Sequence, residues 1–174
     1  MREFRIACLE DLDAVEAIYG EIHTEIEEGR AVIGWKREIY PVRSTAEGAI
    51  HKGTLYLLVE DGVICGSAII DQVQLPTYAG GKWKVPADDE QVLVLHTLAI
   101  SPKAGGRGLG KAFMAFYEEE AKRRGCIDLR IDTNAKNQRA RCMYAHLGYE
   151  EVGIIHCNFQ GLPDIDLVLL EKKV

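Results

Sequence analysis

A run of glycines between residues 101 and 112 is the part of the chain best suited to chemistry. It reads Ser-Pro-Lys-Ala-Gly-Gly-Arg-Gly-Leu-Gly-Lys-Ala, after an apolar run over 92–100 and before a helical pattern over 111–124. Glycines this close together let the backbone approach a ligand, and free N–H groups at the start of a helix attract anions. This order of strand, glycine turn and helix predicts a cradle for a phosphate or pyrophosphate.

Two phosphate-binding patterns fail here at single positions. The Walker A loop needs Ser or Thr after Lys111 to bind magnesium, but Ala112 stands there, which argues against a nucleotide-hydrolysing P-loop. The dinucleotide fingerprint G-x-G-x-x-G needs a third glycine where the chain has Lys111. What remains is the pattern R/Q-x-x-G-x-G/A, which residues 105–110 match at both glycines and miss only at Gly105.

A second motif lies downstream, where residues 137–149 read Asn-Gln-Arg-Ala-Arg-Cys-Met-Tyr-Ala-His-Leu-Gly-Tyr. The GNAT acetyltransferases carry the loop pattern above and, after it, a pattern close to N-x-x-A-x-x-L-Y-x-x-x-G-F. This chain matches it with Met143 for Leu and Tyr149 for Phe. The chain therefore resembles the GNAT superfamily of N-acetyltransferases, more weakly before about residue 50 and over residues 75–91.

The resemblance implies acetyl-CoA as the acyl donor. The matching cofactor positions are Leu98, Ile100, Gly105, Gly106, Arg107, Gly108, Gly110, Lys111 and Asn137. Backbone N–H groups of the loop would hold the pyrophosphate, and Arg107, Lys111 and Lys103 would add positive charge. Leu98 and Ile100 would pair with the pantetheine arm, and the Leu98 N–H would polarise the thioester carbonyl. Asn137 could equally be a helix N-cap.

The implied reaction is direct attack by a primary amine, on a small molecule or an exposed protein amine. Tyr144 matches the family position of the acid that protonates the departing thiolate, although a tyrosine on an apolar helix face is often only a core residue. His96 is the candidate base, because histidine titrates near neutral pH and strand spacing predicts the same face as Leu98. The alternatives are a buried neutral histidine, or a water-linked carboxylate from Glu90, Asp89 or Glu25.

Four aromatic residues are candidates for the acceptor pocket, since they fall in the two irregular regions expected to cover the cofactor groove. They are Trp35, Tyr40, Tyr78 and Trp83. Each could instead be a loop anchor that packs on the core. The sequence predicts no metal site, because the five cysteines are scattered and never spaced C-x-x-C.

The pattern of apolar residues predicts the elements that position these groups. Strands are expected over 4–8, 54–60, 63–73, 92–100, 127–131, 151–159 and 165–170, with a hairpin at Asp61-Gly62 and a final connection over 161–163. Helices are expected from Glu10 to about Ile18, then over 22–28, 44–51, 111–124 and 137–147. The predicted fold is α+β, a GNAT fold with a mixed, mostly antiparallel sheet of six to seven strands flanked by helices.

Composition sets the remaining expectations. A chain of 174 residues with 47% hydrophobic content predicts one domain over residues 1–174. The net charge of −6 argues against nucleic acid as a partner, and no apolar stretch has transmembrane or signal-peptide character, so a cytoplasmic protein is expected. Two other functions stay open: a catalytically silent acyl-CoA sensor and an acyltransferase that uses a longer acyl-CoA. The oligomeric state also stays open, with a homodimer as one option because dimers are common in the family.

Overall fold

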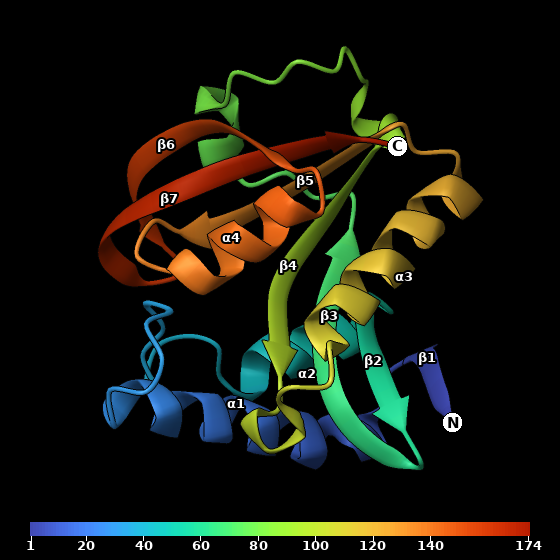
Figure 1. Ribbon diagram of the computed structural model, residues 1–174, viewed down its shortest axis with the longest axis vertical. Coiled ribbons are helices and arrows are strands. Elements are labelled where there is room, and N and C mark those ends of the chain that lie inside the picture. Colours follow the sequence, from blue (N-terminus) through green and yellow to red (C-terminus); the bar gives the residue numbers. More distant parts are fainter. The chain divides into compact units, whose positions relative to one another are not determined.

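The computed structural model describes residues 1–174 and contains seven strands and four α-helices (Figure 1). The strands are β1 (Arg2–Ile6), β2 (Leu55–Glu60), β3 (Val63–Asp71), β4 (Val92–Ile100), β5 (Asp128–Asn134), β6 (Glu150–Phe159) and β7 (Leu162–Lys173). The helices are α1 (Leu12–Glu27), α2 (Arg43–His51), α3 (Leu109–Arg124) and α4 (Gln138–His146), with short 3-10 helices η1 (Leu9–Asp11), η2 (Pro76–Gly80), η3 (Asp89–Gln91) and η4 (Pro102–Ala104).

Hydrogen-bonded neighbours in the sheet follow the order β1-β2-β3-β4-β5-β7-β6. β4 and β5 pair in parallel. The pairs β1–β2, β2–β3, β5–β7 and β6–β7 are antiparallel. The predicted α+β fold with a mixed, mostly antiparallel sheet is therefore confirmed, with seven strands.

The chain divides into two compact units. Unit 1 consists of residues 1–31, 35–70 and 96–116, and unit 2 consists of residues 32–34, 71–95 and 117–174. A single domain over residues 1–174 stays a prediction. None of the helices combines the length and the apolar character that crossing a bilayer requires.

Unit 1 contains β1, β2 and most of β3, which lie side by side in Figure 1. The predicted hairpin turn is present, with φ of 51° at Asp61 and 80° at Gly62, as a type I′ turn requires. The prediction of two separate helices over 10–28 is wrong, because α1 runs without a break through Gly20. Its buried positions include Val15, Ile18, Tyr19 and Ile22, and burial of this face outweighs the cost of one interior glycine.

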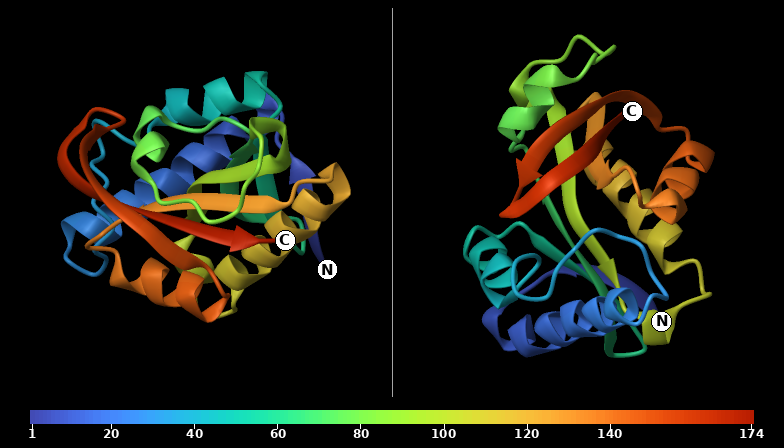
Figure 2. Two further views of the ribbon diagram at one scale, coloured as in Figure 1. Left: turned by 90° about the horizontal axis from the view of Figure 1, so that it is seen from above. Right: turned by 90° about the vertical axis from the view of Figure 1, so that its left-hand side faces the viewer.

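Unit 2 contains β5 and the β6–β7 hairpin, which curves beside it (Figure 2). The expected connection over 161–163 is wrong by two residues: the turn residues are Gln160 and Gly161, with φ of 50° and 83°, and Leu162 already belongs to β7. Leu162 is buried and pairs with Phe159 of β6, so the ladder already begins there. The unit's core groups Tyr78 with apolar side chains of β4, β6 and β7, namely Val92, Val94, Val152, Leu167 and Leu169.

Candidate functional site

The glycine loop of unit 1 presents a row of free backbone donors. Gly106 and Gly108 have φ of 80° and 70°, a conformation that L side chains rarely adopt. The N–H groups of residues 106–111 donate to no backbone carbonyl, and the first bond of the helical type joins Ala112 N to Gly108 O at 3.0 Å. These groups lie at the start of α3, where unpaired donors and the helix dipole favour an anion. The loop therefore has the backbone of the predicted phosphate cradle.

Two of the three cations expected to assist this loop are paired with carboxylates. Arg107 Nη1 lies 2.6 Å from Glu60 Oε2, and Lys103 Nζ lies 2.6 Å from Glu21 Oε1. Both side chains are thus ion-paired with nearby acids in this structure, and the positive charge expected from them toward a phosphate stays a prediction. Lys111 is exposed and takes part in no ion pair.

One residue of β4, next to the predicted donor positions, has an unusual backbone conformation. The parallel ladder with β5 ends at the pair Leu95 and Ile131. Thr97 then has φ of 52°, although it is neither glycine nor at a turn. Regular alternation of side chains does not pass through such a residue. The expectation that His96 shares a face with Leu98 therefore lacks its basis, while Leu98 and Ile100 are half-buried in β4.

Helix α4 of unit 2 carries the other two predicted site residues. Asn137 is its N-cap, and Asn137 Oδ1 accepts a hydrogen bond from Ala140 N at 3.2 Å. Tyr144 is buried, with its ring edge-on to that of Tyr149 at 6.0 Å between centroids. Burial raises the pKa of the Tyr144 phenol above its ordinary value of 10, and the negative charge of Asp132 adds a smaller increase.

The aromatic residues Tyr78 and Trp83 anchor the irregular segment of unit 2. Tyr78 is 1% exposed, and its hydroxyl donates to Asp132 Oδ2 at 2.7 Å. Trp83 Nε1 donates to the Tyr78 carbonyl at 2.7 Å, and the Arg130 guanidinium lies 4.1 Å from the Trp83 ring centroid. These contacts are compatible with loop anchors, and an acceptor-pocket role for the two residues stays a prediction.

The aromatic pair of unit 1 lies between α1 and α2 in the sequence. The rings of Trp35 and Tyr40 meet edge-on, with centroids 6.2 Å apart. Tyr40 is buried, and its hydroxyl is hydrogen-bonded to Thr97 Oγ1 in β4. Tyr40 thus contacts the residue of β4 that has a positive φ.

A buried ionic cluster in unit 2 was missed in the sequence. Asp128 is fully buried, and its Oδ2 accepts a hydrogen bond from Arg130 Nε at 2.7 Å. Glu171, opposite Arg130 on β7, accepts the N–H groups of Lys84 and Val85 at 2.8 and 3.0 Å. Burial, with the nearby Glu171 charge, raises the pKa of Asp128 to about 6. Asp128 and Arg130, two charged residues in the otherwise apolar run 127–131, were the sequence signal for this cluster. Charged side chains on a buried strand need partners.

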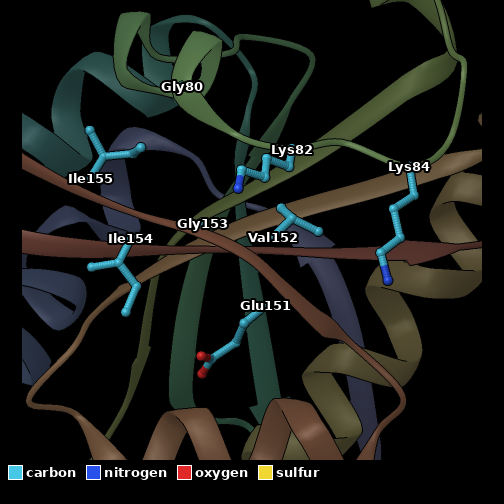
Figure 3. A pocket seen from close by; sticks show the side chains of 8 residues that line it. All are labelled: Gly80, Lys82, Lys84, Glu151, Val152, Gly153, Ile154 and Ile155. Atoms are coloured by element: carbon cyan, nitrogen blue, oxygen red, sulfur yellow. The ribbon is translucent and has the colours of Figure 1, made fainter.

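A cavity of 470 Å³ in unit 2 lies along β6 (Figure 3). Its lining comes from the loop residues Gly80, Lys82 and Lys84 and from residues 151–155. No predicted site residue lines it. The side chains at its rim include Lys84, which pairs with Glu150.

The predicted site residues thus fall into two groups. Unit 1 holds His96, Leu98, Ile100, the loop residues 105–111, Trp35 and Tyr40, and unit 2 holds Asn137, Tyr144, Tyr78 and Trp83. Within unit 1, Tyr40 directly contacts the β4 segment that carries His96 and Leu98. Within unit 2, Asp132 links Tyr78 through a hydrogen bond and influences Tyr144 through its charge.

Comparisons of the chain with known proteins identify its family. A model described as the acetyltransferase (GNAT) family matches residues 15–149. YhfO of Bacillus subtilis (strain 168), described as an uncharacterized N-acetyltransferase, is 25% identical over 130 residues, which make up 69% of this chain and 80% of that protein. The crystal structure of a GNAT-family acetyltransferase from Streptococcus agalactiae 2603 superposes with a TM-score of 0.83 and 25% identity, over 99% of this chain and 95% of that one.

A third relative was solved with its cofactor. The yncA protein of Salmonella typhimurium, whose structure contains acetyl-CoA, has a TM-score of 0.67 and 16% identity, over 99% of this chain and 93% of that one. That likeness shows the fold alone, whereas the family match covers both motifs of this chain. The chain belongs to the GNAT family of acetyltransferases and is an acyltransferase enzyme.

Proposed function

We propose that this chain transfers an acetyl group from acetyl-CoA to a primary amine, either of a small molecule or exposed on a protein. The observation that carries the proposal is the row of unpaired N–H groups over residues 106–111 at the start of α3. In a GNAT-family chain, such a row suits the pyrophosphate of CoA. Lys111 is the loop cation that is still available to add charge.

The remaining cofactor residues come from β4 and α4. The backbone of Leu98 and Ile100 would pair with the pantetheine arm, and Asn137 would line the cofactor while it also caps α4. The bound donor supplies its acetyl group as a thioester. The Leu98 N–H would donate to the thioester carbonyl oxygen, which becomes negatively charged as the amine attacks.

The reaction forms one C–N bond and breaks one C–S bond. The amine nitrogen attacks the carbonyl carbon and gives up a proton, and the thiolate leaves and takes a proton. Tyr144 is the proposed donor of that second proton, because it occupies the motif position of the acid and a phenol is protonated at neutral pH.

His96 is the proposed acceptor of the first proton. Among the carboxylate alternatives, Glu25 is held by Arg30 at 2.7 Å, and this hydrogen bond lowers the pKa of Glu25 and weakens it as a base. Asp89 accepts a hydrogen bond from Gln74 Nε2 at 2.7 Å. His96 lies in β4, two residues before the proposed carbonyl donor Leu98, and imidazole is the side chain most often used as a general base.

The proposal is tested first by ligand binding and then by turnover. Acetyl-CoA should raise the Tm of the protein, whereas ATP with magnesium should not, since a ligand that binds only the native state stabilises it. A Tm shift with ATP–magnesium alone would contradict the proposal. A panel of amines, followed by detection of the released thiol, then identifies the acceptor; acetyl-CoA binding without turnover on any amine would favour a silent sensor.

A further inference from the structure

The hydrogen bond between Tyr40 and Thr97 involves the residue of β4 whose backbone conformation is unfavourable. Thr97 has φ of 52° within a strand, and Thr is β-branched. Such residues rarely adopt this conformation, and it persists only where surrounding contacts hold it. The Tyr40 hydroxyl bonds to the Thr97 side chain and therefore provides one such contact across 57 residues of sequence.

Tyr40 is itself held at several points. Its N–H and C=O both pair with Lys36, at 2.9 and 3.2 Å, and its ring packs edge-on against Trp35. The carbonyl of the next residue, Pro41, is hydrogen-bonded to His23 Nε2 of α1 at 2.9 Å. His23 and Tyr40 are 3% and 6% exposed, so these contacts are shielded from water. The hydroxyl of Tyr40 is thus a fixed point and not a mobile polar group.

Thr97 controls the direction of the backbone donor in the proposed reaction. The N–H of Leu98 belongs to the peptide unit that follows Thr97, so the backbone angles of Thr97 set where this N–H points. A donor contributes to acyl transfer only when it is aimed at the developing negative charge. A change at Thr97 would therefore redirect the Leu98 N–H without removing any atom of the cofactor cradle.

We propose that Tyr40 is a positioning residue, whose hydroxyl holds Thr97 in its left-handed conformation and thereby aims the Leu98 N–H. The proposal rests on the proposed acetyl transfer. It differs from the acceptor-pocket role that the sequence predicted for Tyr40, because Tyr40 acts through Thr97 and need not touch the acceptor.

A double-mutant cycle tests this coupling. The variants are Tyr40→Phe, Thr97→Val and the double variant, each of which removes a hydroxyl and keeps the size of the side chain. We expect each single variant to lower kcat by about tenfold, with the KM for the acceptor nearly unchanged, and the double variant to be no worse than either single one. Thr97→Ser keeps the hydroxyl and should retain the wild-type kcat.

Hydrogen exchange gives a readout that does not depend on turnover. In Tyr40→Phe, we expect the amides of residues 96–98 to exchange at least about fivefold faster than in the wild type, because Thr97 loses its hydrogen bond to the Tyr40 hydroxyl. Tyr19→Phe is the matched control: Tyr19 is also buried in unit 1, but it is not the residue whose hydroxyl bonds to Thr97. This control should change neither exchange nor kcat.

Three outcomes would overturn the proposal. One is unchanged exchange or unchanged kcat in Tyr40→Phe. Another is a loss of kcat in the double variant that equals the product of the losses in the two single variants. The third is a raised acceptor KM with kcat retained, which would make Tyr40 a pocket residue. If the wild type shows no acetyl transfer, the proposed function fails, while the exchange measurement still decides whether Tyr40 holds Thr97.

Discussion

Tyr144 is a buried phenol whose pKa is raised by burial and by the Asp132 charge. A group that stays protonated at neutral pH can give its proton to a departing thiolate. We expect Tyr144→Phe to lower kcat by about 10²–10⁴-fold, the usual range for loss of a general acid, while acetyl-CoA still binds. Thiol release measures kcat, and calorimetry measures the Kd of acetyl-CoA.

Tyr149→Phe is the control for this variant. Tyr149 is buried beside Tyr144, but its hydroxyl donates to Glu118 Oε1 at 3.4 Å, so it serves packing and not the proposed chemistry. Its kcat should match that of the wild type. If Tyr144→Phe also retains the wild-type kcat, Tyr144 is not the acid.

Asp128 should make stability depend on pH in an unusual direction for a carboxylate. Its folded-state pKa of about 6 lies above the ordinary value of 3.8, so the folded protein binds this proton more tightly than the unfolded chain. The stabilisation is fully present below pH 3.8 and is lost as the pH rises through 6. A shift of this size corresponds to roughly 3 kcal/mol.

The variant Asp128→Asn isolates this effect. We expect the free energy of unfolding, measured by urea denaturation, to depend less on pH between 4 and 7 in Asp128→Asn than in the wild type. Glu47→Gln is the control, since Glu47 is exposed on α2 and takes part in no ion pair. Identical pH dependence in wild type and Asp128→Asn would assign the buried proton to another group.

At the scale of elements, Glu171 of β7 forms hydrogen bonds with the irregular segment 72–91. It accepts two backbone N–H groups, from Lys84 and Val85, one on each carboxylate oxygen. Gln can accept at only one atom and presents an NH₂ group to the other donor, so Glu171→Gln should destabilise the segment by about 1–3 kcal/mol. We expect trypsin to cleave faster after Lys82 and Lys84 in this variant.

Glu150→Gln is the control for the trypsin experiment. Glu150 pairs with the Lys84 side chain, but both side chains are well exposed, and exposed pairs contribute little. Its cleavage rate should stay close to that of the wild type. Equal rates in Glu171→Gln would mean that the segment is held by Tyr78 and Trp83 without this carboxylate.

Elements with strong local signals could be predicted from sequence. The Asp61-Gly62 turn and the Asn137 cap of α4 each depend on residues only a few positions apart. The positive φ at Thr97 could not be predicted, because nothing in the apolar run over 92–100 interrupts the strand pattern. The hydroxyl that bonds to Thr97 belongs to Tyr40, which is distant in the sequence. The break expected in α1 failed for the same reason, since burial and not local propensity decided the helix.

At the scale of the whole molecule, the sequence showed where glycines and cations lie in the loop but not which cations pair with acids. The glycine positions were readable, because their backbone conformation is a local property. The acids that pair with Arg107 and Lys103 come from β2 and α1, and only the folded chain brings them to the loop. Charge pairing of this kind has no signature in composition or spacing.

This pairing leads to a prediction about salt. The chain carries a net charge of −6, and Lys111 is the loop cation without an ion pair, so we expect backbone N–H groups to provide most of the proposed attraction for the pyrophosphate. Contacts made by fixed dipoles at short range are screened less than those between exposed charges. We expect the Kd of acetyl-CoA to rise by less than about threefold between 0.05 and 0.5 M KCl. Lys111→Gln should raise the Kd by about three- to tenfold at low salt and remove most of the dependence of the Kd on salt.

Lys52→Gln, an exposed lysine after α2, is the control and should leave the Kd unchanged. A steep loss of affinity with salt in the wild type would show that charged side chains, and not the glycine loop's backbone, carry the binding.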